Sequence, residues 1–491
     1  MLYFVSLLLL VVSTLGDIQC PTDNIISDGV WPYGATDKVL LPANYTCVFN
    51  FAIPAGFIVQ FEAQVDYKFF GNDSVWIRDT VGDLTYFPSS GTKMIPAVAA
   101  QVTVTAMTNQ AKVFLRYSFI NVQKFKSVMK NTGDYMKLVL DPGTSYTFTS
   151  QANDRVALTS QSEDPNDIAS IYVYEGDSIV SNYLGQLGRT QSPTFYASSK
   201  SITIVNYYNT TSTYWSIAND KSKIDQYGVY DIVLTGSQLM SNVSFYNYLP
   251  NFGAFSIICT DSTDTNIESM QFHGFVEGGG MKVQFIPMTP THNMNPLITY
   301  QPDGYLNMQF PQKIPAKIFT ILAQKSNVDI KFNQNLATWN TPYDGRNILV
   351  FSPTMWDPAN SPAFDYNFQA SWKLNYTVTV DSLKIGAINE KLHLTIGSAN
   401  QQSVVDKDFI CDANQATCSK SYPTPYFGIA DFVKLTYTGT NSMSMSQVHI
   451  KVVDPNPTTP VAPTTVSTPT TTRVGSRSSW MIVPIMMCLL K

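Results

Sequence analysis

The stretch Asp73-Ser74-Val75-Trp76-Ile77-Arg78-Asp79 decides the fold class, because a small polar residue followed by apolar, aromatic and apolar residues leads into a turn. The same layout returns as Ala169-Ser170-Ile171-Tyr172-Val173-Tyr174-Glu175-Gly176-Asp177. In both places a loop with a proline and a β-branched strand follow, Val102-Thr103-Val104 in the first and Ile202-Thr203-Ile204-Val205 in the second. Repetition of a whole layout predicts tandem modules.

Short alternating or β-branched runs continue outward from this repeat over residues 17 to about 453. Phe57-Ile58-Val59-Gln60-Phe61 and Tyr376-Thr377-Val378-Thr379-Val380 are examples, and turn residues separate such runs. No segment keeps an apolar period of 3.6 residues over three turns. The pattern predicts an all-β protein made of sandwiches, in which each strand buries one face.

The first sixteen residues, Met1 to Gly16, form an apolar run of signal-peptide length in front of polar sequence. Gly16 and Thr14 place small residues at the expected cleavage positions. The apolar part is too short to span a membrane comfortably, so we expect a cleaved signal peptide rather than an uncleaved anchor.

Six cysteines fit export into an oxidising compartment. We expect Cys20 to pair with Cys47 near the start of the mature chain, and Cys411 to pair with Cys418. Cys259 ends an apolar run and is expected to be a buried thiol in a strand. The chain has no C-x-x-C spacing and its four histidines are scattered, which argues against a zinc site.

Tripeptides of the form N-x-S/T suggest a glycoprotein, because several of them follow a signal peptide. We expect their asparagines on exposed turns or strand ends. The candidate N-glycosylation sites are Asn44, Asn72, Asn209, Asn242 and Asn375.

A Thr- and Pro-rich tract begins at Asp454 and is predicted to be a disordered, extended stalk that carries O-linked sugars. An apolar tail from Trp480 to Leu490 follows and contains Pro484. The tail is short for a membrane span and suggests a signal for a glycosylphosphatidylinositol anchor, with a soluble secreted form as the alternative. The candidate attachment residues are Gly475, Ser476, Ser478 and Ser479.

The early cysteine pair, the run from Asn50 to Phe57 and the stretch from Asp73 to Asp79 together resemble a CUB domain, and most closely the divergent CUB-like family expanded in nematodes. The resemblance is good over 17–123 and fair over 131–215, although the second cysteine pair of the CUB pattern is missing. It implies tandem CUB-like β-sandwich domains of the jelly-roll type. The expected divisions are 1–16 signal peptide, 17–123 CUB-like domain, 131–246 second CUB-like domain, 247–453 β-rich region, 454–479 stalk and 480–491 tail.

The resemblance also raises a calcium site, because some CUB domains bind Ca²⁺ through a Glu and two Asp near the middle strand. The carboxylates available here are Glu62, Asp66, Asp73 and Asp79. The alternative, solvated loop acids, is the one we adopt, so we predict no metal and no cofactor.

The sequence offers no support for catalysis, because it contains no G-x-S-x-G, H-E-x-x-H or P-loop motif. Gly278-Gly279-Gly280 is expected to form a hairpin turn. The net charge of −5 argues against a nucleic-acid partner. We therefore predict a protein that is not an enzyme.

A dense group of aromatic residues could form a sugar-binding face or could pack in the core, and we take core packing as the default. The group consists of Tyr207, Tyr208, Tyr214, Trp215, Tyr246 and Tyr248.

The sequence thus predicts a non-catalytic binding glycoprotein on the outer leaflet of the plasma membrane, in membrane rafts or elsewhere, whose partner is an unknown extracellular protein or glycan. Resemblance to the CUB-like family further implies a role in innate immune or stress response to pathogens. The alternative is a soluble secreted structural or matrix protein without a defence role.

Overall fold

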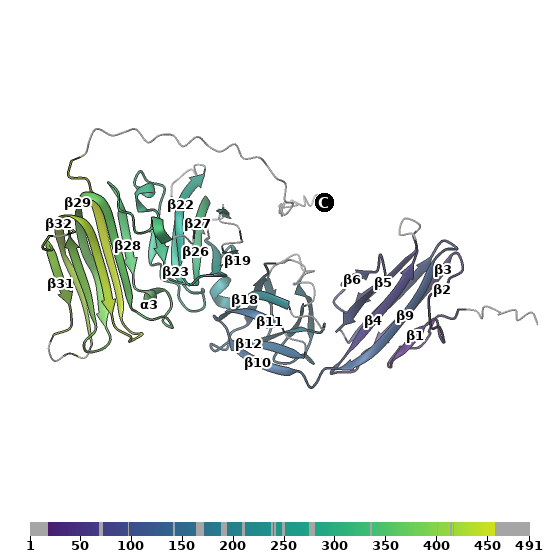
Figure 1. Cartoon of the computed structure of the whole chain (residues 1–491). Helices are drawn as coiled ribbons and strands as arrows, with labels where there is room; N and C mark the ends of the chain where they lie inside the picture. Colours follow the sequence, from purple (N-terminus) through teal and green to yellow (C-terminus); the bar gives the residue numbers. More distant parts are fainter. Residues whose placement is uncertain are drawn as a thin grey trace, which may run out of the picture.

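The computed structural model describes residues 18–456, apart from 68–71, 97, 141–142, 164–170, 188–193, 209–211, 237–238, 240–241, 248–250, 274–279, 334–335, 400, 413–414 and 416. The predicted signal peptide, residues 457–479 of the predicted stalk, the tail and the anchor residues lie outside this range. Strands dominate the described chain, which confirms the predicted all-β class, and they form units that follow one another in a row (Figure 1). No helix among the described residues has the length and apolar character needed to cross a membrane.

The first unit, residues 18–121, is a two-layer sandwich. One sheet has the order β3-β8-β5-β6. The other has the order β1-β9-β4-β7, and β2 also pairs with β9. Phe49, Phe51 and Phe61 lie between the sheets and are buried. The strands are β1 (Gly29–Trp31), β2 (Val39–Leu40), β3 (Tyr45–Ala52), β4 (Phe57–Asp66), β5 (Ser74–Asp79), β6 (Leu84–Tyr86), β7 (Gly91–Ile95), β8 (Ala99–Ala106) and β9 (Lys112–Asn121).

The second unit, residues 126–220, has sheets in the orders β10-β12-β17-β14-β15 and β11-β18-β13-β16. It is followed by the short helix α2 (Lys221–Ile224). The strands are β10 (Lys126–Asn131), β11 (Tyr135–Leu140), β12 (Thr144–Thr149), β13 (Val156–Gln161), β14 (Ile171–Glu175), β15 (Tyr183–Gln186), β16 (Thr194–Tyr196), β17 (Ser201–Asn206) and β18 (Ser212–Asp220).

The third unit, residues 229–333, has sheets in the orders β19-β21-β26-β23-β24 and β20-β27-β22-β25. The strands are β19 (Val229–Thr235), β20 (Asn242–Asn247), β21 (Gly253–Cys259), β22 (Thr265–His273), β23 (Lys282–Pro287), β24 (Ile298–Tyr300), β25 (Gln312–Ile314), β26 (Ile318–Gln324) and β27 (Ser326–Asn333), with the 3-10 turn η3 (Leu306–Gln309) before β25.

These three units are repeats of one topology, because adding nine to each strand number from β2 onward reproduces every sheet pairing of the preceding unit. The opening strands β10 and β19 pair in parallel with β12 and β21. In the first unit a single parallel bridge between Ile25 and Phe51 stands at the corresponding place. The sequence showed the first two repeats and not the third. Strand pairing also crosses residue 246, since β19 and β20 pair with β21 and β27.

The fourth unit, residues 347–453, is built differently. Its six strands form one connected sheet in the order β28-β33-β29-β32-β30-β31. The 3-10 turn η4 (Leu336–Thr338) precedes it and helix α3 (Pro353–Trp356) follows β28. The strands are β28 (Asn347–Phe351), β29 (Phe364–Ile385), β30 (Lys391–Gly397), β31 (Val405–Phe409), β32 (Cys418–Thr438) and β33 (Met445–Val453).

The two long strands carry this sheet into both layers of the fourth unit. The first part of β29 pairs with the last part of β32, which also pairs with β30. After a register shift between Gln369 and Leu374, β29 pairs instead with the first part of β32 and with β33. The layers enclose a core that includes Phe368, Tyr376 and Leu435, all buried.

Apolar contacts join successive units. Met94 of the first repeat and Val122 of the segment that follows it pack with tyrosines of the second. Between the second and third repeats, Ile217 and Ile232 lie in one cluster. Trp356 of helix α3 packs in the core of the third repeat. Buried apolar contact of this kind therefore joins each unit directly to the next.

Candidate binding site between the first and second repeats

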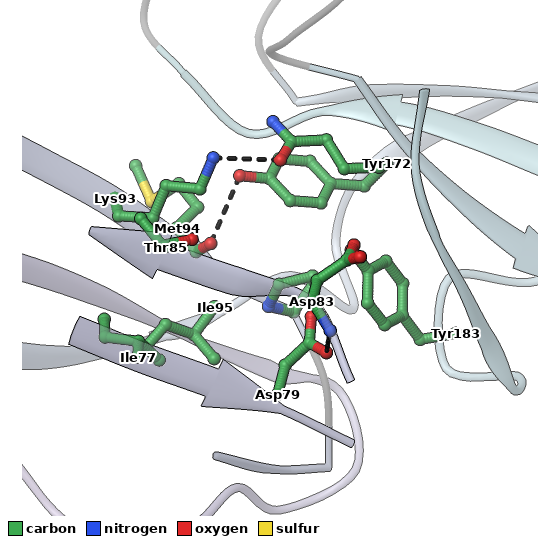
Figure 2. A pocket seen from close by; sticks show the side chains of 11 residues that line it. Ile77, Asp79, Asp83, Thr85, Lys93, Met94, Ile95, Tyr172 and Tyr183 are labelled. Carbon is green, nitrogen blue, oxygen red and sulfur yellow. Dashed lines mark hydrogen bonds between the residues drawn. The ribbon is translucent and has the colours of Figure 1, made fainter. Parts of the chain in front are cut away.

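A pocket opens to solvent where the first repeat meets the second (Figure 2). The space inside it that a water molecule can enter is about 20 Å³, so it is a shallow hollow with room for the tip of one side chain rather than for a whole small molecule. The first repeat contributes the ends of β5 and β7 and the turn before β6, and the second contributes β14 and β15. The lining residues are Ile77, Asp79, Asp83, Thr85, Lys93, Met94, Ile95, Pro96, Tyr172, Tyr183 and Gln186.

Tyrosines from the second repeat fix its position against the first. The hydroxyl of Tyr172 donates to the carbonyl of Met94 at 3.1 Å, and the hydroxyl of Tyr174 donates to the carbonyl of Pro96 at 3.4 Å. Tyr207 donates to the Tyr174 hydroxyl at 2.8 Å, and Tyr208 accepts from the Met94 N–H at 3.3 Å. Burial raises the pKa of Tyr207 and of Tyr174 well above 10, so these hydroxyls stay protonated as donors.

Lys93 and Gln186 form the polar bridge across the pocket. The Lys93 ammonium donates to Gln186 Oε1 at 2.9 Å and lies 6.0 Å from the centre of the Tyr172 ring. Figure 2 shows the Lys93 side chain extending toward Tyr172. The lysine comes from strand β7 of the first repeat and its partners from β14 and β15 of the second, so the bridge exists only when both repeats are in place.

An acidic turn forms the opposite wall. Asp79 Oδ1 accepts the backbone N–H groups of Val81 at 3.0 Å and Asp83 at 2.9 Å, which closes the turn between β5 and β6. Burial raises the pKa of Asp79, and those backbone donors act against the rise. The Asp83 side chain lies beside Tyr183 in Figure 2. The eleven residues that line the pocket include no histidine, cysteine or serine.

A second hollow lies at the same junction, along the segment that connects the two repeats. Phe125 follows β9 and forms one side, and Ile179 in the turn between β14 and β15 forms another. The remaining lining residues are Val122, Gln123, Ser127, Ser145, Asp177, Ser178 and Val180.

The structure does not bring the four calcium candidates together. Glu62 pairs with Arg116 at 3.6 Å and Asp66 pairs with Lys38 at 3.9 Å, both on the sheet of β4 and β9. Asp79 closes the turn described above. Among the described residues, no three or more His, Cys, Asp or Glu side chains form a group suited to a metal ion.

Asp73, the fourth candidate, has a structural contact set. Its side chain is buried and accepts the backbone N–H groups of Met107 at 2.7 Å and Thr108 at 2.9 Å, and also the Thr108 hydroxyl at 2.6 Å. The carboxylate therefore ties the start of β5 to the turn after β8.

Both predicted disulfides are confirmed: Cys20 bonds to Cys47, and Cys411 bonds to Cys418. Cys259 is a fully buried thiol at the end of β21, outside any disulfide, as expected. Burial raises its pKa.

The candidate glycosylation asparagines differ in their surroundings. Asn44 and Asn72 are exposed in turns with φ of 63° and 61°, and Asn242 is exposed at the first position of β20. Asn375 is half-buried in the interior of β29, which departs from the expectation of turns and strand ends, because β29 is far longer than the sequence indicated. Asn209 lies outside the described residues.

Most of the aromatic group is in the interior. Tyr214 and Trp215 are buried, and Tyr207 and Tyr208 belong to the junction between the first two repeats. Tyr246 is 57 % exposed on β20. Tyr248 lies outside the described residues, so core and junction packing accounts for four of the six.

The glycine run needs one correction. Gly280 has a φ of +89°, a turn conformation, while Gly278 and Gly279 lie outside the described residues. The flanking strands β22 and β23 belong to different sheets, so the expected hairpin turn is wrong. The same strand-to-strand connection crosses between the sheets in every repeat.

The pocket itself was not visible in the sequence. Lys93, Gln186 and Tyr183 carry no motif, and they meet only because the second repeat docks on the end of β7. The one feature of the sequence that could have indicated the pocket was the turn at Asp79, at the end of the stretch from Asp73 to Asp79.

Residues 16–129 match the model of the CUB-like domain family. A search of curated protein sequences found no match. The CUB1-EGF-CUB2 domains of rat MASP-1 are 10% identical, with a TM-score of 0.17, 40% of this chain covered and 100% of that one. The extracellular region of zebrafish Gpr126/Adgrg6 is 8% identical (TM-score 0.17; 87% and 52% covered), and an archaeal virus turret protein with a triple jelly-roll fold is 7% identical (TM-score 0.15; 85% and 84% covered). The family match and the sandwich of β1–β9 identify the first repeat as a CUB-like domain.

Proposed function

We propose that this protein is an extracellular, non-catalytic binding glycoprotein displayed at the cell surface, whose first two repeats together hold the ligand. The observation that carries the proposal is the pocket between these repeats, which has a CUB-like domain as one wall and a fixed tyrosine junction as the other. CUB-like domains are typical of extracellular binding proteins.

The pocket chemistry favours a cationic group on the ligand. Asp79 and Asp83 supply acidic side chains, and because the Tyr172 and Tyr183 rings are buried and Lys93 already lies over Tyr172, these carboxylates are the groups that would hold the cation. We infer that an extracellular protein presents a basic side chain here, with a glycan as the alternative partner.

The arrangement of the units supports display away from a membrane. The CUB-like domain is at one end of the row and β33, the last strand, is in the unit at the other end (Figure 1). If residues 454–479 form a stalk and Gly475, Ser476, Ser478 or Ser479 carries the lipid, the fourth unit lies nearest the membrane and the first two repeats, with the pocket between them, lie farther along the row. Residues 1–16 would direct the chain to this route as a signal peptide.

Binding is tested with the full chain on an array of extracellular proteins and glycans. Asp83→Asn and Tyr183→Ala should each weaken binding about tenfold or more, since the first removes a negative charge from the acidic turn and the second removes the ring that forms part of the opposite wall. Asp303→Asn, an exposed loop acid of the third repeat, is the matched control. Unchanged binding by both pocket variants would exclude this site.

Display and role are tested separately. A phospholipase that cleaves inositol anchors should release the protein from intact cells, whereas recovery from the medium without treatment would support a soluble secreted matrix protein. Expression should rise on bacterial challenge if the protein serves innate immune or stress response, and a flat response would count against the defence role.

A further inference from the structure

Three of the exposed large apolar side chains of the fourth unit lie close together on one face of its sheet. Phe427 is 60 % exposed, Ile429 is 51 % exposed and Val453 is 51 % exposed. Their neighbours in sequence, Gly428, Ala430 and Val452, face inward and are buried. The three exposed residues come from β32 and β33, which lie on either side of β29.

One polar residue stands at the centre of this group. Asn375 on β29 is directly opposite Ile429 on one side and directly opposite Val453 on the other. Thr377, two residues along, is opposite Phe427. Directly opposite residues in antiparallel strands point to the same face, with Cβ atoms about 4.5–5.5 Å apart. The Asn375 side chain therefore leaves the sheet between the three apolar side chains.

Asn375 also begins the tripeptide Asn375-Tyr376-Thr377, an acceptor pattern for N-linked sugar. The exposed candidates Asn44, Asn72 and Asn242 lie in turns or at a strand end, where a glycan projects into water. A glycan on Asn375 would instead start in the middle of a sheet face. Its first sugar rings would lie over the strands next to β29.

We propose that Asn375 carries an N-linked glycan whose first sugar rings pack on Phe427, Ile429 and Val453 and cover them. This inference rests on the proposed function, because N-glycosylation requires the secretory route. A sugar ring has C–H groups on its faces and hydroxyls at its rim, so it can lie flat on an apolar surface while its hydroxyls remain in water. A phenyl ring such as that of Phe427 offers the flat surface that this contact needs.

The place of these apolar residues in the sheet explains what a covering glycan would do. In the described pairings, the first part of β32 joins only β29, so it is the edge of its layer. An edge strand with exposed apolar side chains is a template for pairing with another chain. Pro423 and Pro425 interrupt the edge before Phe427, and the glycan would protect the portion that continues to Ile429.

Occupancy is tested by glycopeptide mass spectrometry on the full chain secreted from a eukaryotic host. The result expected is sugar on Asn375 together with Asn44, Asn72 and Asn242. A bare Asn375 beside occupied sites would overturn this inference and leave the proposed function intact. Absence of sugar at every site would instead count against the secretory route itself.

The cover is tested with Thr377→Val, which removes the acceptor pattern and keeps both Asn375 and a β-branched residue in the strand. Binding of an apolar fluorescent dye should rise several-fold, and light scattering should show self-association. Adding Phe427→Thr and Ile429→Thr should return both readings to the starting level. Thr46→Val, which removes the acceptor pattern at Asn44, is the control and should change neither.

Trimming the glycans enzymatically to one sugar separates a local cover from general solubility. Because the first ring makes the contact, the trimmed wild-type chain should keep its low dye binding. A Thr377→Val chain that stays monomeric and binds no additional dye would overturn the cover.

Discussion

The first repeat and the fourth unit both enclose a two-layer β core, but they connect the layers in different ways. In the first repeat, nine short strands are divided between two sheets that share no strand. In the fourth unit, β29 and β32 each run through both layers. The layers of the first repeat are held together by contacts between segments that are distant in sequence. The layers of the fourth unit are joined by two strands that continue from one layer into the other.

The disulfides follow this difference. Cys20 and Cys47 are 27 residues apart and tie the beginning of the chain to β3, in the middle of a set of short strands. Cys411 and Cys418 are only 7 residues apart and close the connection from β31 into β32. Closing a longer loop removes more freedom from the unfolded chain.

The largest predicted effect is loss of the first disulfide. The double change Cys20→Ala and Cys47→Ala should lower the stability of the first repeat by about 3.5 kcal/mol, against about 2.5 kcal/mol in the fourth unit for Cys411→Ala with Cys418→Ala. Hydrogen exchange on the intact chain, followed peptide by peptide, measures the two units separately. Equal losses would contradict the dependence of the stabilisation on the length of the closed loop.

The next effect concerns a buried carboxylate that fastens a loop of the fourth unit. Glu390 accepts the backbone N–H groups of Thr440 and Asn441, each at 2.7 Å, together with the hydroxyls of Ser444 and Tyr437. Glu390→Gln should cost about 2–3 kcal/mol, because an amide replaces a charged acceptor and turns a donor toward donors. Exchange protection around residues 386–444 reports the loss, and protection unchanged there would contradict the role of this carboxylate.

The same carboxylate gives the fourth unit a pH dependence. Burial raises the pKa of Glu390, but the hydrogen bonds from Ser444, Asn441 and Thr440 outweigh burial and the pKa is lowered from 4.5. A group with a lowered folded pKa contributes its full stability above the unfolded value, and that contribution falls as pH drops through the folded value. Protection of this loop should therefore be steady above pH 4.5 and decline below it, and Glu390→Gln should remove the decline.

Part of this architecture was predictable from local pattern. The pattern of the strand from Ser74 to Asp79 recurs from Ile171 to Glu175 because each of these strands lies between an equivalent pair of strands in its own repeat. Similar residues therefore suit both strands. The third repeat escaped detection because its corresponding strand, β23, reads Lys282-Val283-Gln284-Phe285-Ile286-Pro287 and shares only alternation with the others. The third repeat keeps the same topology because its strands bury apolar side chains, and many different apolar residues can fill a buried position equally well.

The site depended on facts that no local pattern contains. Lys93 and Gln186 are far apart in sequence and become neighbours only through the docking of two repeats. The alignment of Asn375 with Ile429 and Val453 depends on the register of β29, β32 and β33. That register follows the shift between Gln369 and Leu374. Cysteine pairing was predictable because the spacing of a few cysteines leaves few choices, whereas register and docking leave many.

The smallest effect separates the tyrosine junction from ordinary tyrosine burial. Tyr172→Phe should cost about 1 kcal/mol, because it removes the hydroxyl that donates to the Met94 carbonyl and leaves that acceptor without its tyrosine. Tyr300 in the third repeat is equally buried, but no partner for its hydroxyl is found among the described residues. Tyr300→Phe should therefore leave stability unchanged or raise it slightly. Exchange protection is measured at the ends of β7 and β14 for Tyr172→Phe and at β24 for Tyr300→Phe. If the two variants lost equal protection, apolar contact alone would hold the first two repeats together. The pocket between them would then lack the hydrogen-bonded wall on which its fixed shape depends.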